Sequence, residues 1–167
     1  MQDKLKELEQ WERKKLWVIN QHKRAMKLCQ RLFGIPYIQH SIRFEPQFED
    51  KAAEFIECPK KQALFEYSME YMFDRGENGQ YAHTEYDCFG EDPYIGDIDC
   101  ADNWRVVALA IMAHEIAHAV REMYFDALVD RYGELKRVSE PVCWHDTYWQ
   151  KCYAELREEM LLWIGVE

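Results

Sequence analysis

Residues 106–120, VVALAIMAHEIAHAV, restrict the fold more than any other part of this chain. Every position is apolar except His114, Glu115 and His118, so a helix formed here is apolar on all sides. Such a helix is typical of the buried centre of a protein, and we expect it to cover residues 104–125. An unpaired buried polar group costs about 1–3 kcal/mol. The two imidazoles and the carboxylate therefore need partners, and a metal ion would serve all three.

The three polar residues form an H-E-x-x-H motif. Side chains four residues apart project from one helix face, so His114 and His118 can both reach a metal ion at the Zn–N distance of about 2.0–2.1 Å. Glu115 can then take a proton from a water molecule on the metal, as a general base. A chain of this composition contains the motif by chance only about 0.025 times. The favoured interpretation is one Zn²⁺ per chain; the alternative is a pair of core histidines bonded to backbone carbonyls.

A third ligand is required, because a catalytic zinc takes three protein ligands and keeps one open position. The last predicted helix, residues 146–164, has apolar side chains at i, i+3 and i+4 spacing that include Trp149. His145 lies four residues before Trp149 and so on the same inward face, which makes it the favoured third ligand. The other candidates for this position are Glu140, Glu134 and His83.

Two supporting roles have several candidates each. Carboxylates are expected to orient the ligand histidines. The unranked candidates for that role are Asp97, Asp99, Asp126 and Asp130. A donor to a developing oxyanion is also expected. Among the ten tyrosines, Tyr148 and Tyr153 lie close in sequence to His145, although a packing role is the more common one for aromatic residues in such a helix.

The rest of the pattern predicts an α+β fold, in which helices pack on a small, mostly antiparallel sheet around the central H-E-x-x-H helix. The length supports a single domain, residues 1–167, with an N-terminal basic helix over 1–34 and a catalytic core over 80–164. Other predicted helices are 3–33, 48–57 and 60–73, and the predicted strands are 41–45, 80–89 and 94–100.

Charge is distributed unevenly over a chain whose formal net charge is −10. Residues 1–31 contain nine basic and four acidic side chains, whereas residues 44–103 contain sixteen acidic and four basic ones. The favoured interpretation is a solvated helix whose basic side chains cover acidic surface of the same domain. The alternatives are contact with nucleic acid through residues 1–31, and an acidic protein that mimics DNA.

The six cysteines include no C-x-x-C pair, which argues against a zinc ribbon and favours reduced, mostly buried thiols. The first fifteen residues contain no apolar run, and no stretch approaches the roughly 18 apolar residues of a membrane span. We therefore expect a cytoplasmic protein without a membrane partner.

Two motifs together carry a family resemblance. H-E-x-x-H-A at residues 114–119, followed by H-D-x-x-W at 145–149, resembles the SprT-like zinc metallopeptidases, which include the Spartan proteases. In that family a His-Gly-x-x-Phe/Trp pattern supplies the third zinc ligand. The resemblance covers about residues 80–160 and implies a zincin-like fold and an intracellular hydrolase with Glu115 as general base. The zinc ligands that it implies are His114, His118 and His145. Some members of the family degrade proteins crosslinked to or bound on DNA.

The sequence thus predicts a zinc metallopeptidase that acts on a protein or peptide substrate. The alternative function is a non-catalytic interaction protein of zincin fold, associated with nucleic acid or DNA-binding proteins, in which the metal is a structural pin. Glu115 argues against this alternative, because a purely structural site needs no base beside the metal.

Overall fold

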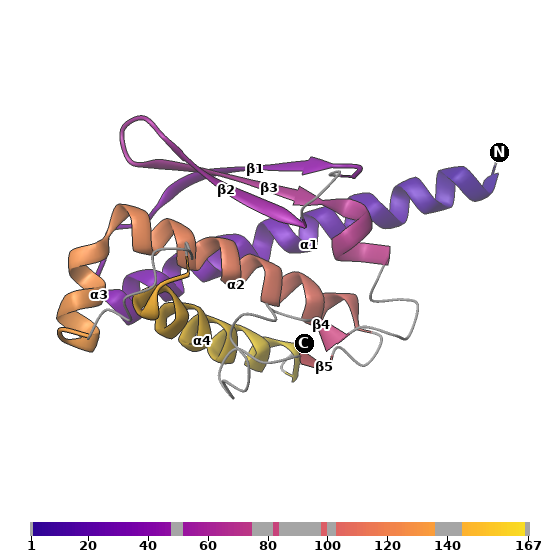
Figure 1. The fold of residues 1–167 in the computed structure, drawn as a ribbon. Coiled ribbons are helices and arrows are strands. Elements are labelled where there is room, and N and C mark those ends of the chain that lie inside the picture. Colours follow the sequence, from indigo (N-terminus) through magenta and orange to yellow (C-terminus); the bar gives the residue numbers. More distant parts are fainter. Residues whose placement is uncertain are drawn as a thin grey trace.

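The chain has an α+β fold in a computed structural model that describes residues 2–47, 52–74, 82–83, 98–99, 103–135 and 145–165 (Figure 1). The helices are α1 (Gln2–Phe33), α2 (Trp104–Met123), α3 (Phe125–Tyr132) and α4 (Thr147–Leu161), with a π-helix at Glu70–Asp74 and a final 3₁₀ turn at Leu162–Gly165. The strands are β1 (Gln39–Glu45), β2 (Ala53–Cys58), β3 (Gln62–Ser68), β4 (Ala82–His83) and β5 (Ile98–Asp99).

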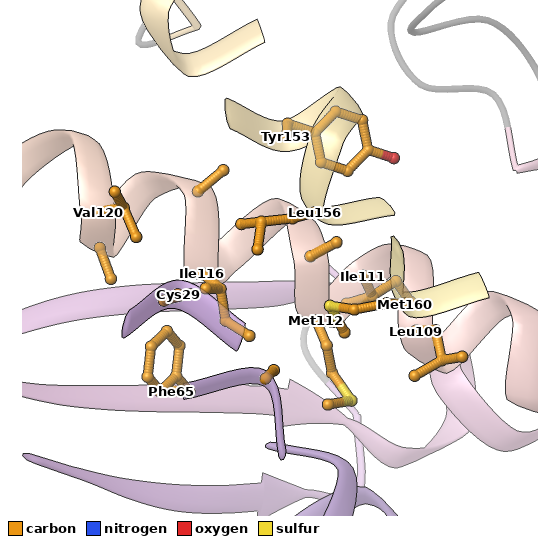
Figure 2. Packing of buried hydrophobic residues seen from close by; sticks show 14 of the residues in the cluster. Cys29, Phe65, Leu109, Ile111, Met112, Ile116, Val120, Tyr153, Leu156 and Met160 are labelled. Carbon is orange, nitrogen blue, oxygen red and sulfur yellow. The ribbon is translucent and has the colours of Figure 1, made fainter. Parts of the chain in front are cut away.

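Helix α2 lies between the three-stranded sheet and α4 (Figure 1). All residues from Val107 to Ala117 are buried. Figure 2 shows why the helix must be apolar on opposite sides: Phe65 of β3 and Cys29 of α1 lie on one side of it, and Leu156 and Met160 of α4 on the other. The predicted central, buried helix is therefore confirmed.

The ends of α2 follow from local contacts. Asn103 is the N-cap, because its Oδ1 accepts a hydrogen bond from the Arg105 backbone N–H at 3.1 Å. At the other end Tyr124 leaves the helical conformation, with φ −140° and ψ 41°, and its N–H bonds to the Val120 carbonyl at 2.9 Å. The chain then turns into α3, a short helix that the sequence did not predict.

The three-stranded sheet is mixed, which corrects the expectation of a mostly antiparallel sheet. Its order is β1–β3–β2, with β3 parallel to β1 and antiparallel to β2. The chain passes from β1 to the opposite edge before β3 enters between the two, and this path makes one pairing parallel. Strand β1 contains the predicted strand 41–45. Strands β4 and β5 form the predicted antiparallel pair, and the other residues of 80–89 and 94–100 lie outside the described part.

The helices predicted over 48–57 and 60–73 are wrong. Their described residues form β2, β3 and the π-helix that follows. Gln, Ala, Leu and Glu in β3 favour a helix when taken alone. Ala63, Phe65 and Tyr67 nevertheless alternate along the strand and are all buried. Hydrogen bonding on both sides of β3, with burial of this alternating face, outweighs the helix propensity of single residues.

Helix α1 confirms the helix predicted over residues 3–33, and some of its basic side chains have partners within the chain. The buried Lys14 donates from Nζ to the Phe73 carbonyl at 3.2 Å. Arg31 pairs with Glu159 of α4 at 3.1 Å. This second contact is of the intramolecular kind favoured from the sequence. Contact of α1 with nucleic acid stays a prediction.

Two expectations from composition concern thiols and membranes. Cys29 and Cys152 are buried free thiols and Cys58 is a half-buried one, as predicted; Cys88, Cys100 and Cys143 lie outside the described part. Among the helices described, none has the length and apolar character needed to cross a bilayer.

Candidate metal centre

Three histidines from two parts of the chain meet at one point. His114 and His118 lie one turn apart on α2, and His145 directly precedes Asp146, the N-cap residue of α4. Their Nε2 atoms lie 3.2 Å apart for His114 and His118, 3.0 Å for His118 and His145, and 3.3 Å for His114 and His145. The histidines are therefore close enough to bind one metal ion.

The size of this triangle fits a tetrahedral ion. Ligand nitrogens at about 2.0–2.1 Å from a tetrahedral metal lie about 3.3 Å from one another. The observed Nε2 separations, 3.0 to 3.3 Å, are near that value. The three imidazoles could thus occupy one face of a tetrahedron around an ion and leave its opposite corner to another ligand.

Hydrogen bonding among the rings does not account for the triangle. A neutral imidazole nitrogen either carries a hydrogen and donates, or has a lone pair and accepts. With three such nitrogens in mutual contact, at least two equal partners face each other, either two lone pairs or two N–H groups. A cation in the centre receives all three lone pairs and removes this conflict.

Aromatic packing holds the three imidazoles in place. The ring of Trp149, which is fully buried, lies 4.8 Å from that of His114, 5.2 Å from that of His118 and 4.1 Å from that of His145, between centroids. Tyr153 stacks on Trp149 at 5.0 Å. Rings that are already packed lose little freedom on binding a ligand, so the site is preorganised.

Burial keeps His118 and His145 in the neutral form that can bind a metal ion. Burial, followed by the charges of His145 and Arg121, lowers the pKa of His118 to about 3. Burial likewise lowers the pKa of His145 to about 4, against the opposing effect of Asp146. Both rings are therefore neutral at pH 7, and metal coordination requires neutral imidazole.

Glu115 lies beside the triangle and is not a member of the ligand group. It is 6% exposed, and its Oε1 lies 3.9 Å from Nε2 of His114. Burial, followed by the negative charge of Glu115, raises the pKa of the Tyr67 phenol on β3. The Glu115 carboxylate therefore also influences a residue of the sheet. A carboxylate this close to a ligand nitrogen is within reach of a water or substrate group next to the metal position.

The alternative third ligands do not join this group within the part of the chain that the structure describes. Glu134 is exposed after the end of α3. His83 lies on β4, but its side chain is outside the described part, as is the whole of Glu140.

The carboxylate that follows His145, Asp146, was not among the carboxylates predicted from the sequence. Asp146 follows His145, caps α4 and forms an ion pair with Arg121 of α2. Its position directly before an amphipathic helix is an N-cap signal that could have singled it out. Of the predicted carboxylates, Asp126 and Asp130 are exposed on α3, while Asp97 and the side chain of Asp99 lie outside the described part.

Tyr148, one of the two tyrosines considered for the oxyanion, has a structural role. Its hydroxyl donates to the Gly133 carbonyl at 3.0 Å and accepts from the Leu135 N–H at 3.0 Å. These bonds tie the first turn of α4 to the end of α3. Tyr153 is buried against Trp149, with its ring 5.8 Å from that of His114.

Comparison with known proteins adds no relative. No family model matches this chain, and neither a curated protein nor a solved structure matches it at a significant level. The functional argument therefore depends on the geometry of the three histidines and Glu115.

Proposed function

We propose that this chain is a zinc-dependent metallopeptidase of the SprT-like kind, with His114, His118 and His145 as zinc ligands and Glu115 as general base. The observation that carries the proposal is the triangle of three Nε2 atoms, 3.0–3.3 Å apart, with a buried carboxylate oxygen 3.9 Å from one of them. Two motifs that are separate in the sequence thus supply the parts of one site.

The donor set favours zinc in a catalytic rather than a structural role. Neutral imidazoles suit zinc, and three histidines are a known ligand set for catalytic zinc. Structural zinc sites have four protein ligands, usually including cysteine thiolates. Among the described residues no fourth side chain joins the group, and Cys152 of α4 is not a member of it. The remaining corner of the tetrahedron is therefore assigned to water and substrate.

The chemistry divides between the metal and Glu115. Zinc, when bound, would lower the pKa of a water molecule to about 7 and polarise a peptide carbonyl. Glu115 would accept a proton from the attacking water and deliver it to the departing amine nitrogen. Its burial supports this role, because a carboxylate that is 6% exposed has few competing water contacts. Trp149 would keep the imidazoles in orientation throughout.

The test separates metal binding from catalysis. Purified protein is analysed for metal by mass spectrometry and assayed on a fluorogenic protein substrate, beside Glu115→Gln and His118→Ala. We expect about one zinc per chain in the wild type and in Glu115→Gln, with proteolysis lost in both variants and zinc lost in His118→Ala. Full activity in Glu115→Gln would exclude the proposed base. Zinc in a wild type that cleaves no substrate would favour the non-catalytic alternative.

A further inference from the structure

Arg121 connects the helix that carries two ligands to the segment that carries the third. It lies one turn beyond His118 on α2. Its Nε and Nη2 both donate to Oδ2 of Asp146, at 3.1 and 2.8 Å, and its Nη1 donates to Oε1 of Glu122 at 2.6 Å. A guanidinium held by two carboxylates has a fixed position, since each contact uses a different edge of its planar fork.

Both carboxylate oxygens of Asp146, the residue that follows His145, accept hydrogen bonds. One oxygen, Oδ2, receives Arg121, and the other, Oδ1, accepts from the Trp149 N–H at 2.9 Å as the N-cap of α4. The backbone of His145 has an additional bond, because Gln150 donates to its carbonyl at 3.1 Å. The first turn of α4, and with it His145, is therefore attached to α2 through this ion pair, in addition to the packing of Trp149 on His114 and His118.

The third ligand needs such an attachment more than the other two do. His114 and His118 are fixed relative to each other by the hydrogen bonds of α2. His145 belongs to no helix or strand and lies 27 residues beyond His118. Metal–ligand distances are satisfied only within about 0.2 Å, so a small displacement of one imidazole weakens the site.

We propose that the Arg121–Asp146 ion pair is the positioning element of the metal centre: it sets His145 in register with His114 and His118 and thereby determines zinc affinity. This inference rests on the proposed zinc site. Both side chains of the pair are about one-third exposed, at 32% and 35%. Ion pairs with this exposure contribute little to the free energy of unfolding. We therefore expect loss of the pair to change zinc affinity more than global stability.

The sign of one substitution distinguishes positioning from electrostatics. Arg121→Gln removes a positive charge near a site for a dication, so electrostatics alone predict tighter zinc binding. Positioning predicts weaker binding. Asp146→Asn keeps a good N-cap residue and removes the ion pair together with one negative charge near the site, so both electrostatics and positioning predict weaker binding for it. Arg121→Lys keeps the charge without the fork and should recover part of the loss.

The experiment measures zinc dissociation constants by competition with a chromophoric chelator, and melting temperatures of the metal-free proteins. The control is Glu155→Gln, which breaks an ion pair between Arg131 of α3 and α4, away from the histidines. We expect Arg121→Gln and Asp146→Asn each to weaken zinc binding by at least about ten-fold. The double variant should be no weaker than either single one, and Glu155→Gln should bind as the wild type does.

The results separate the positioning role of the Arg121–Asp146 ion pair from the zinc site itself. Affinity within two-fold of the wild type in Asp146→Asn, tighter binding in Arg121→Gln, or an equal loss in Glu155→Gln would overturn the positioning role while leaving the zinc site intact. A wild type that binds no zinc would overturn the proposed function, and this inference with it. Weakened binding at melting temperatures equal to that of the control supports the inference.

Discussion

Zinc should stabilise the folded protein by an amount that can be calculated. The proposed ligands come from α2 and from the residue before the N-cap of α4, and an unfolded chain does not bring His145 to the other two. At the proposed site zinc would therefore bind the native state alone. At a free zinc concentration of 100 times the dissociation constant, the stabilisation is about 2.7 kcal/mol. For a chain of this length each kcal/mol raises the melting temperature by about 2–4 °C, which gives an increase of about 5–11 °C.

The assay is thermal unfolding followed by circular dichroism at pH 7, after chelation and again with zinc added. His145→Ala should lose most of the zinc-dependent increase, because it removes the ligand that joins the two segments. His40→Ala is the matched control: this half-buried histidine lies outside the ligand group, with its Nδ1 3.0 Å from the Ile38 carbonyl. It should melt lower than the wild type yet keep the full increase. An equal increase in His145→Ala, or none in the wild type at saturating zinc, would refute the reasoning.

Three further predictions concern the scaffold. Burial, followed by the charge of His40, holds the pKa of His22 well below 6.5, so the unfolded state binds an extra proton below that pH. Between pH 7 and 5.5, urea unfolding should show the metal-free wild type losing about 1 kcal/mol more stability than His22→Gln, and equal losses would contradict this. Lys60 has φ 63° in the β2–β3 turn, so Lys60→Gly should raise the unfolding free energy by up to about 1 kcal/mol. The same change at helical Lys27 should lower it by about 1 kcal/mol, and a matching decrease at Lys60 would refute the strain. Ile116→Ala should lower the unfolding free energy by about 2–5 kcal/mol, because Ile116 is fully buried on the sheet side of α2, with no change in zinc stoichiometry.

The parts of the fold that could be predicted are those with one dominant local signal. The central helix was predictable because a run that is apolar on all sides and follows the capping residue Asn103 is typical of a buried helix. Strand β3 was not, since its residues favour a helix and its alternating face gains stability only when β1 and β2 pair with it. The parallel pairing of β1 with β3 is also a property of the chain path, which no local pattern encodes.

The candidate site also has a part that local sequence predicts and a part that it does not. The placement of His114 and His118 follows from helix periodicity. His145 was predicted by counting back four residues from Trp149, but it precedes the extended N-cap residue Asp146, so its position is set by tertiary contacts and not by the periodicity of α4. The ion pair between Arg121 and Asp146 joins residues 25 positions apart and could not be predicted, because nothing in either local sequence specifies the other. Of the four carboxylates considered from the sequence for orienting the histidines, the two that the structure describes, Asp126 and Asp130, are exposed on α3.

The most direct measurement is X-ray absorption at the zinc edge of the purified, zinc-loaded protein. Three imidazoles and one water should give four nitrogen or oxygen neighbours at about 2.0–2.1 Å, with outer-shell scattering from three rings and none from sulfur. His145→Ala should lose the scattering of one ring. Sulfur at about 2.3 Å, or a spectrum unchanged by removing His145, would contradict a site built from these three histidines.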